Sequence, residues 1–494
     1  MRQVLTRALI VCLFILQAAS GQQPGEISYS DSPIMPEGLK GKRIQSVIDT
    51  VNSGSPERVR SFISTECTER FRNIVSMDDH ISTVLGFNQN TGGVDFSGIR
   101  SYVPERKGET VVILKGRNLE DFWGLTVRFA EAPDFLIAGI GISPARPPSG
   151  LQEPPLTEEQ FIFLTKNTMA KLGDKGAFSG ALLIARGEKV LFATAAGEAS
   201  KSFHVPNNID TKFNLGSMNK MFTSTAIVRL AEQGKLSFSD PISKYIDESW
   251  LPKEVTDKIT IRHLLTHSSG LGSYFNETYD KSSRELFRRL DDYKPLIKDD
   301  RPAFEPGARF QYSNTGMFLL GVVIEKVSGQ DYFDHIRQAI YEPAGMKNTD
   351  CYEMDYPVEN LAIGYSPDWK SPYGWQNNLY KHVIKGGPAG GGFSTVNDLH
   401  KFALALLSGK LVSKESLQTM WTDHLKANYG YGFTVVEDAA GKRVGHSGGF
   451  AGINSRLDIY LDSGSIVAVM SNIDMGAGPL AGKINQLLAR VKTE

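Results

Sequence analysis

The sequence is poor in cysteine, in net charge and in long hydrophobic runs. Three cysteines among 494 residues exclude a scaffold built on many disulfides. The net charge is −1 and no long basic run occurs, so the chain lacks the electrostatic pattern of a nucleic-acid-binding protein. No apolar stretch reaches the length of a membrane-spanning helix. With 41% hydrophobic and 22% charged residues, the composition is otherwise that of an ordinary globular protein.

The first residues have the pattern of a secretory signal. Arg2 and Arg7 form a basic segment before a short apolar run over residues 8–16, and small residues follow at 18–21. This order predicts a signal peptide over residues 1–21 and a secreted or periplasmic protein, with no stable membrane span after cleavage. An uncleaved anchor is the alternative, and the shortness of the apolar run argues against it.

Composition and periodicity divide the rest of the chain into two domains. Residues 22–40 are rich in Gly, Pro, Ser and Gln and predict a flexible leader. Residues 41–143 show apolar residues at helical spacing and then strand-like apolar runs, which predicts a small α+β domain. A proline-rich linker over residues 144–157 separates it from a second domain over residues 158–494.

The second domain begins with a capping box, because Thr157 is followed three residues later by Gln160. The pattern that follows predicts, in order, a helix, a hairpin, a largely helical middle, two adjacent strands and a last helix. This order predicts an α+β domain with an antiparallel sheet flanked by helices and a helical subdomain. The last two strands are expected near residues 457–461 and 465–472, and the last helix near 479–490.

Ser217 and Lys220 are the most informative pair of residues in the chain. Their spacing of three places both side chains on one face of a helix. A serine hydroxyl needs a base within hydrogen-bond reach to become a nucleophile. A lysine serves as that base only when desolvation or nearby positive charge lowers its pKa. The Ser-x-x-Lys pattern occurs in penicillin-recognising serine enzymes, but many surface helices carry it by chance.

Two further motifs give the pair its context. Tyr312–Asn314 has the form Tyr-x-Asn, and His446–Gly449 has the form His-x-Gly near the C-terminus. With Ser217–Lys220, this ordered set resembles the class C β-lactamase-like serine hydrolases, a superfamily of β-lactamases, D-alanyl-D-alanine peptidases, D-aminopeptidases and carboxylesterases. The resemblance extends over about residues 159–494 and implies a β-lactamase/transpeptidase-like fold. The smaller domain before it is similar in element order to the cone-shaped NTF2-like domains.

The resemblance implies a role for each motif residue. Ser217 is the nucleophile, and its backbone N–H donates to the developing oxyanion. Lys220 and Tyr312 share the proton transfer, and either of them can be the base. Asn314 orients Lys220 and the substrate amide. The third motif supplies substrate and oxyanion contacts through His446, Ser447, Gly448 and Gly449. Taken in isolation, Tyr312 is typical of a core aromatic residue and Asn314 of a turn.

His446 departs from the β-lactamase pattern. Class C β-lactamases resemble this set but have a lysine there, which is a permanent cation, whereas a histidine near pH 7 is mostly neutral. β-Lactams and D-Ala-D-Ala peptides present a carboxylate to this region, so efficient β-lactamase activity is not expected. The chain is therefore predicted to be a serine hydrolase that forms an acyl-enzyme on an ester or short amide, of carboxylesterase, D-aminopeptidase or D-alanyl-D-alanine peptidase type. The alternatives are a class C-type β-lactamase and a non-catalytic penicillin-binding or sensor protein.

Neither a metal nor an organic cofactor is predicted. His263 and His267 have the spacing of a metal pair, but no third ligand is apparent and the phrase is a structural turn in the family. The glycine-rich run 386–392 lacks the ending of a phosphate loop and predicts a mobile loop beside the active site. Cys67 and Cys351 fall in different predicted domains and are expected to be separate thiols. The expected partner is a small-molecule or short-peptide substrate, and the N-terminal domain is a candidate surface for a homodimer.

Overall fold

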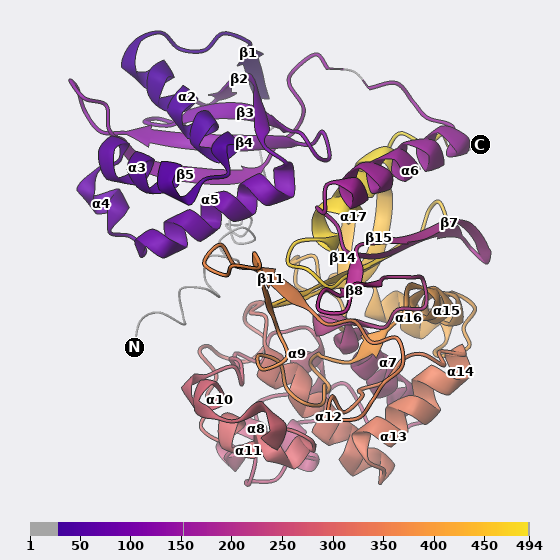
Figure 1. Cartoon of the computed structure of the whole chain (residues 1–494). Helices are drawn as coiled ribbons and strands as arrows, with labels where there is room; N and C mark the ends of the chain where they lie inside the picture. Colours follow the sequence, from indigo (N-terminus) through magenta and orange to yellow (C-terminus); the bar gives the residue numbers. More distant parts are fainter. Residues whose placement is uncertain (1–27, 152, 493–494) are drawn as a thin grey trace. The chain divides into compact units, whose positions relative to one another are not determined.

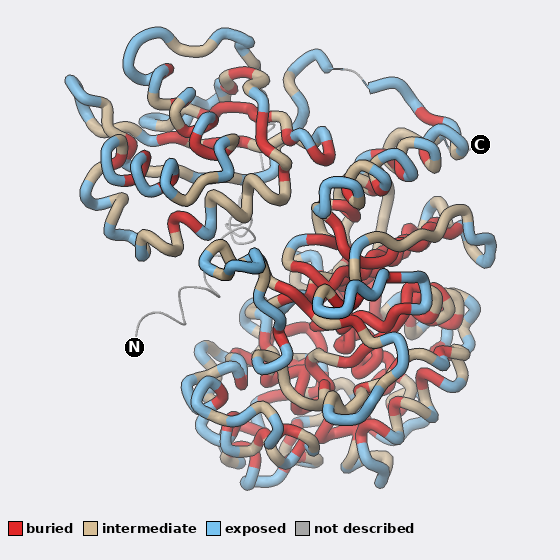
Figure 2. The backbone as a smooth tube through the Cα atoms, viewed as in Figure 1, coloured by how far each residue is buried: buried red, intermediate tan, exposed pale blue. Residues whose placement is uncertain are grey.

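The structure is a computed structural model that describes residues 28–151 and 153–492. The chain divides into two compact units. The N-terminal unit comprises the described residues up to Pro155 together with Ala170–Ala177 and Asp368–Gly374, and the C-terminal unit comprises the others. Within each unit, buried residues are concentrated on the sheet and on the inner faces of its helices (Figure 2). The predicted signal peptide, residues 1–21, lies outside the described residues.

The N-terminal unit contains a five-stranded antiparallel sheet in the order β1-β2-β3-β4-β5 (Figure 1). Its strands and helices are β1 (Ser28–Ser32), α2 (Gly38–Ser53), α3 (Pro56–Glu66), α4 (Glu69–Arg72), α5 (Met77–Thr91), β2 (Val94–Val103), β3 (Thr110–Gly116), β4 (Phe122–Phe129) and β5 (Ile137–Pro144). Ile44 and Val47 on α2 share a buried apolar cluster with Val112 and Leu125 on the sheet. Apart from β1, helices precede strands, as the hydrophobic periodicity predicted. The likeness to NTF2-like domains stays a prediction.

Part of the predicted flexible leader forms a strand and the first residues of α2, so that prediction is wrong for residues 28–32 and 38–40. The strand β1 pairs with β2, which places Asp31 opposite Arg100. Arg100 donates from Nε and Nη2 to the two carboxylate oxygens of Asp31 at 2.9 and 3.0 Å, and both side chains are at most 5% exposed. The guanidinium also lies 3.8 Å from the ring centre of Tyr29. The polar strand β1 is therefore held by an ion pair with a residue that is distant in the sequence. The composition of the segment gives no sign of this pair.

The C-terminal unit is built on a six-stranded antiparallel sheet in the order β14-β15-β16-β17-β6-β7. The strands are β6 (Gly180–Arg186), β7 (Lys189–Ala196), β14 (Thr434–Asp438), β15 (Gly441–Phe450), β16 (Ile453–Tyr460) and β17 (Ser465–Ser471). The early hairpin β6–β7 therefore joins the last strands of the chain at β17. The helices α15 (Val396–Leu407) and α17 (Ala477–Leu488) both pack on β17.

A helical region completes the C-terminal unit. Its helices α7 (Asn219–Glu232), α9 (Ile261–Leu265) and α13 (Tyr332–Ile336) pack on α12 (Asn314–Ser328), a helix that is buried from Thr315 to Ile324 (Figure 1). The predicted antiparallel sheet flanked by helices, with a helical subdomain, is confirmed. This fold packs α7 against α12 and packs β15 against the turn at residues 216–218 that precedes α7, although these segments are far apart in the sequence.

Several local predictions in this unit are also confirmed. The capping box is present, because the Thr157 N–H donates to Gln160 Oε1 at 3.0 Å and the Gln160 N–H donates to Thr157 Oγ1 at 3.2 Å. It opens the helix α6 (Glu158–Asp174). The hairpin, the last two strands and the last helix lie within a few residues of their expected positions.

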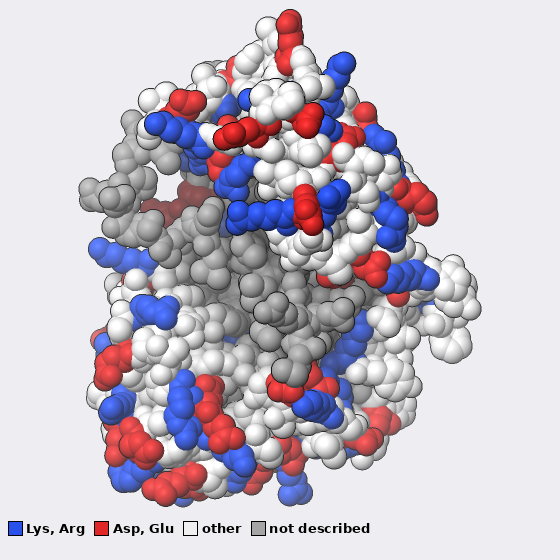
Figure 3. Space-filling view, turned by 90° about the vertical axis from the view of Figure 1, so that its left-hand side faces the viewer, with Lys and Arg blue, Asp and Glu red and all other residues white. Residues whose placement is uncertain are grey.

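The described surface carries charges of both signs. On the face shown in Figure 3, Lys and Arg side chains are interspersed with Asp and Glu. None of the helices in residues 28–151 and 153–492 is long and apolar enough to cross a membrane. Cys67 and Cys351 are buried free thiols.

Replacing Arg100 by alanine should destabilise the N-terminal unit, because the carboxylate of Asp31 would then be buried without a counter-charge. We expect the free energy of opening of β2 and β3, measured by native-state hydrogen exchange, to fall by about 3–5 kcal/mol. Arg117→Ala is the control, since Arg117 forms an exposed pair with Asp95 and its loss should cost less than about 1 kcal/mol. Equal effects of the two substitutions would contradict a stabilising role of the buried pair.

Candidate active site

Ser217 lies at the beginning of a helix that follows a short strand. The strand β10 (Phe213–Asn214) leads into a 3₁₀ turn, η1 (Gly216–Met218), from which α7 continues. The predicted Ser-x-x-Lys helix is therefore present, and its first turn has 3₁₀ geometry. The first N–H groups of a helix have no intrahelical acceptor, so this turn can present backbone donors to a ligand.

Backbone segments approach Ser217 closely from two directions. Gly216 has φ +51°, and a Cβ there would lie 2.8 Å from the backbone nitrogen of Gly449. A Cβ on Gly448 would lie 1.9 Å from the Leu215 carbonyl oxygen, and one on Gly390 would lie 2.9 Å from the Gly216 oxygen. Glycine at these positions lets η1 lie directly between β15 and the glycine-rich run. That run is held against η1 by hydrogen bonds, among them from the Gly391 N–H to the Gly216 carbonyl at 3.1 Å.

Lys220 is completely buried, and its amino group meets three oxygen atoms. Nζ lies 3.0 Å from Ser217 Oγ, 2.9 Å from Asn314 Oδ1 and 2.5 Å from the Ala389 carbonyl oxygen. Burial disfavours the ammonium form and holds the pKa of Lys220 well below its usual range. The structure thus brings Ser217 and Lys220 into contact, in surroundings where a lysine can lose its proton.

Tyr312 lies beside Lys220. The centre of its ring is 4.8 Å from Lys220 Nζ, and 39% of the residue is exposed. Burial of the phenol raises the pKa of Tyr312, and a hydrogen bond with the Ser217 side chain opposes that rise. The hydroxyl group therefore faces Ser217 and keeps its proton at neutral pH.

Asn314 is held by the start of α12. Ser313 is the N-cap residue of that helix, and its hydroxyl donates to the Gly272 carbonyl at 2.9 Å. The side-chain oxygen of Asn314 accepts from Lys220, and its Nδ2 donates to Ser273 Oγ at 3.3 Å. The second motif therefore contacts the first through Asn314.

The third motif lies on β15. His446 is buried, whereas Ser447 and Gly449 are exposed. His446 Nδ1 lies 2.5 Å from the Ser447 carbonyl oxygen, and Nε2 lies 3.0 Å from the Tyr429 hydroxyl. Burial and the nearby Lys220 lower the pKa of His446 to about 3, although the bond to the Ser447 carbonyl opposes the shift. His446 therefore stays neutral at pH 7 and in moderately acidic solution.

His267 and Tyr429 lie beside the predicted site residues, although neither was assigned to the site from the sequence. The ring centre of His267 lies 4.3 Å from that of Tyr312 and 4.7 Å from that of Tyr429. His267 Nδ1 accepts the Ser313 N–H at 3.1 Å, and its carbonyl accepts the Gln311 N–H at 2.7 Å. The turn at His267 therefore holds both neighbours of Tyr312. Nothing local in the sequence points to Tyr429.

The two histidines at metal-like spacing have different surroundings. His263 forms a capping box with Thr260 at the start of α9, whereas His267 packs beside Tyr312. Within residues 28–151 and 153–492, no group of three or more His, Cys, Asp or Glu side chains is placed to hold a metal ion.

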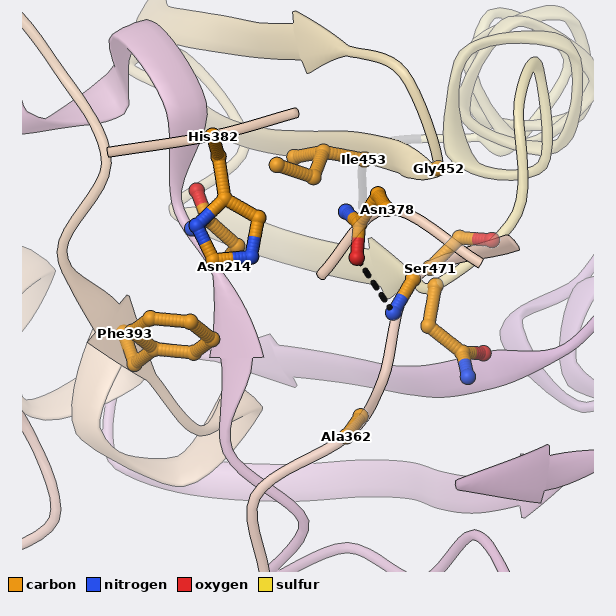
Figure 4. A pocket seen from close by; sticks show the side chains of 10 residues that line it. Asn214, Ala362, Asn378, His382, Phe393, Gly452, Ile453 and Ser471 are labelled. Carbon is orange, nitrogen blue, oxygen red and sulfur yellow. Dashed lines mark hydrogen bonds between the residues drawn. The ribbon is translucent and has the colours of Figure 1, made fainter. Parts of the chain in front are cut away.

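A separate pocket adjoins β10 (Figure 4). Asn214, His382 and Phe393 are among its lining residues. The Asn214 side-chain oxygen accepts the Gly216 N–H at 2.8 Å. The lining contains neither Ser217 nor Lys220, so this pocket adjoins the nucleophile segment without exposing it.

Comparisons with known proteins agree with the C-terminal fold. A family model described as Beta-lactamase matches residues 165–490. Penicillin-binding protein 4* of Bacillus subtilis is 32% identical over 318 residues, which cover 61% of this chain and 69% of that protein. A penicillin binding protein from Bacillus halodurans has a TM-score of 0.60 at 32% identity, covering 65% of this chain and 98% of that one. A D-stereospecific amidohydrolase from Streptomyces sp. has a TM-score of 0.52 at 26% identity, covering 62% and 92%.

Replacing Gly216 by alanine should displace Ser217, because the new Cβ would meet the backbone of β15. We expect the rate of Ser217 modification by a fluorophosphonate to fall by about 100-fold, the effect of a misplacement near 1 Å. Gly234→Ala is the matched control. Gly234 also has positive φ, +69°, but a Cβ there meets nothing within 4 Å. If both variants react equally slowly, backbone strain rather than the close approach to β15 explains the loss.

Proposed function

The chain belongs to the beta-lactamase family and is a serine hydrolase of that superfamily, and we propose that it cleaves esters or short amides through an acyl-enzyme on Ser217. The observation that carries this proposal is the fully buried Lys220, with Nζ 3.0 Å from Ser217 Oγ. A serine beside an amine that readily loses its proton is an activated nucleophile.

Lys220 is the base in this proposal. Asn314 Oδ1 and the Ala389 carbonyl oxygen both accept hydrogen bonds from Nζ. A neutral amine has two N–H groups and one lone pair. If those two oxygens take both N–H groups, the lone pair of Lys220 faces Ser217 Oγ and can accept its proton. Tyr312 is less suited to start the reaction, because burial raises the pKa of its phenol.

Acyl transfer then follows in balanced steps. Ser217 Oγ bonds to the substrate carbonyl carbon as its proton passes to Lys220. The oxyanion is stabilised by the backbone N–H groups of Ser217 and Gly449. Tyr312 donates its proton to the leaving group as Lys220 returns one to Tyr312, and the bond to the leaving group breaks. Water then repeats the sequence on the acyl-enzyme, which releases the acid and restores Ser217.

An uncharged third motif favours esters and amides over β-lactams as substrates. A carboxylate on the substrate would need a cation or free N–H donors, and neutral His446 supplies no charge. The likeness to a D-stereospecific amidohydrolase supports a short amide of a D-amino acid as one substrate class. A secreted or periplasmic location is part of the proposal and rests on the basic, apolar and small residues of the N-terminus.

A fluorophosphonate should add once to the full-length protein, as measured by intact mass. Ser217→Ala should abolish the adduct, and Lys220→Met should slow its formation by about 100-fold or more, the usual contribution of a general base. Ser224→Ala on the same helix is the control, since its buried hydroxyl has no hydrogen-bond partner among the described residues. No adduct on folded protein would contradict the proposal and favour a non-catalytic binding protein.

The pH profile should distinguish the two candidate bases. With Lys220 as base, kcat/KM for a neutral ester should rise as pH passes upward through its lowered pKa and level off below about pH 10, because the neutral amine is then fully formed. The acid limb should remain in Tyr312→Phe. A rate that continues to climb above about pH 10, and loses that climb in Tyr312→Phe, would instead identify a tyrosinate base.

A further inference from the structure

Four rings form a continuous cluster between the second and third motifs. They belong to Tyr312, His267, Tyr429 and His446. His267 lies against Tyr312 and Tyr429, with ring centres 4.3 and 4.7 Å apart, and Tyr429 meets His446 edge-on at 5.7 Å. Tyr429 and His446 are only 4% and 5% exposed. This ring cluster determines what the third motif can present to a substrate.

The hydrogen bonds of His446 specify its protonation. The Ser447 carbonyl oxygen, 2.5 Å from Nδ1, can only accept, so Nδ1 carries a hydrogen. Nε2 lies 3.0 Å from the Tyr429 hydroxyl. Burial raises the pKa of Tyr429 far above its usual value, so this hydroxyl keeps its proton and can donate. In the neutral ring, Nε2 is the acceptor that completes this pair.

Both nitrogens of His446 are therefore used inside the protein. The ring offers a substrate neither a positive charge nor an unshared N–H group. A second proton would have to reside on Nε2, where it would meet the Tyr429 oxygen and add a charge near buried Lys220. Desolvation opposes that state at any pH, and Lys220 adds to the opposition whenever it carries a proton.

Building on the function proposed above, we propose that Tyr429 is a positioning residue that holds His446 in its neutral Nδ1–H form. The site thereby selects acyl donors that carry no carboxylate at the third-motif strand. The favoured substrate class is uncharged at that end, as an ester, an amide or a blocked peptide is. Tyr429 acts through His446 and does not itself contact the substrate.

Paired substrates test this selectivity. We would compare N-acetyl-D-alanyl-D-alanine with its C-terminal amide and count only cleavage of the central peptide bond. Benzylpenicillin and its methyl ester would be compared by the mass and rate of the acyl-enzyme. Wild-type protein should prefer the uncharged member by about tenfold or more, because a carboxylate that leaves water without finding a donor costs its desolvation free energy. Equal rates for both members would overturn the inference while leaving the proposed hydrolase intact.

Tyr429→Phe tests the positioning role, with Tyr431→Phe as the matched control. Tyr431 is also buried, but its hydroxyl has no hydrogen-bond partner among the described residues. Tyr429→Phe should reduce the preference for the uncharged member by about fivefold, the worth of one ordinary hydrogen bond. Tyr431→Phe should leave it unchanged. A merely structural role would lower both rates and keep their ratio.

Nitrogen-15 NMR of the histidine rings gives a readout that does not need activity. In wild-type protein, His446 should show hydrogen on Nδ1 and a hydrogen-bonded acceptor at Nε2, and Tyr429→Phe should shift Nε2 towards the value of a free acceptor. A charged ring, or a hydrogen on Nε2 in the wild type, would overturn the inference. Absence of both turnover and the fluorophosphonate adduct, with the expected NMR pattern, would instead contradict the proposed function alone.

Discussion

The burial of the Lys220 amino group is the constraint on which the rest of the site depends. Removing a charged amine from water is costly unless it is paired or loses its proton. Here Nζ meets oxygens from three separate segments: Ser217, Asn314 and Ala389. A functional site of this kind needs its groups placed to within about 0.5 Å. The packing of α7 against α12 and against the glycine-rich run is therefore both a structural and a chemical requirement.

Close approach of backbone segments meets that requirement. Gly216, Gly390 and Gly448 remove side chains where η1 lies between β15 and the glycine-rich run. A single added methyl group at Gly448 would fall 1.9 Å from a carbonyl oxygen. The glycine-rich run was expected to be a mobile loop. Its hydrogen bonds to η1, and the contact of its Ala389 carbonyl with Lys220, make it a wall of the site.

The aromatic residues around the site set its charge. His267 and His446 both have a lowered pKa, because both are buried near Lys220. Because both histidines are neutral and buried, the amine of Lys220 is the group of this cluster that is best placed to accept a proton from Ser217. It also leaves little positive charge for an anionic substrate. The same desolvation that prepares Lys220 as a base therefore bears on which substrates the site accepts.

Features that depend on short spacings along the chain could be predicted before folding was considered. A spacing of three on a helix places Ser217 and Lys220 on one face. The same spacing lets Thr157 and Gln160 form the capping box at the start of α6. The order of the three motifs likewise indicated the C-terminal fold and the candidate site residues.

Contacts between groups that are distant in the sequence could be found only in the folded chain. The strand β1 is held by Arg100, and Lys220 meets the carbonyl of Ala389. His446 owes its protonation to Tyr429 and the Ser447 carbonyl. These contacts join a polar segment, a glycine-rich segment and single residues. None of these has a hydrophobic periodicity from which the contact could be predicted. Burial and hydrogen-bond partners set the chemistry of such groups, and both exist only once the chain has packed.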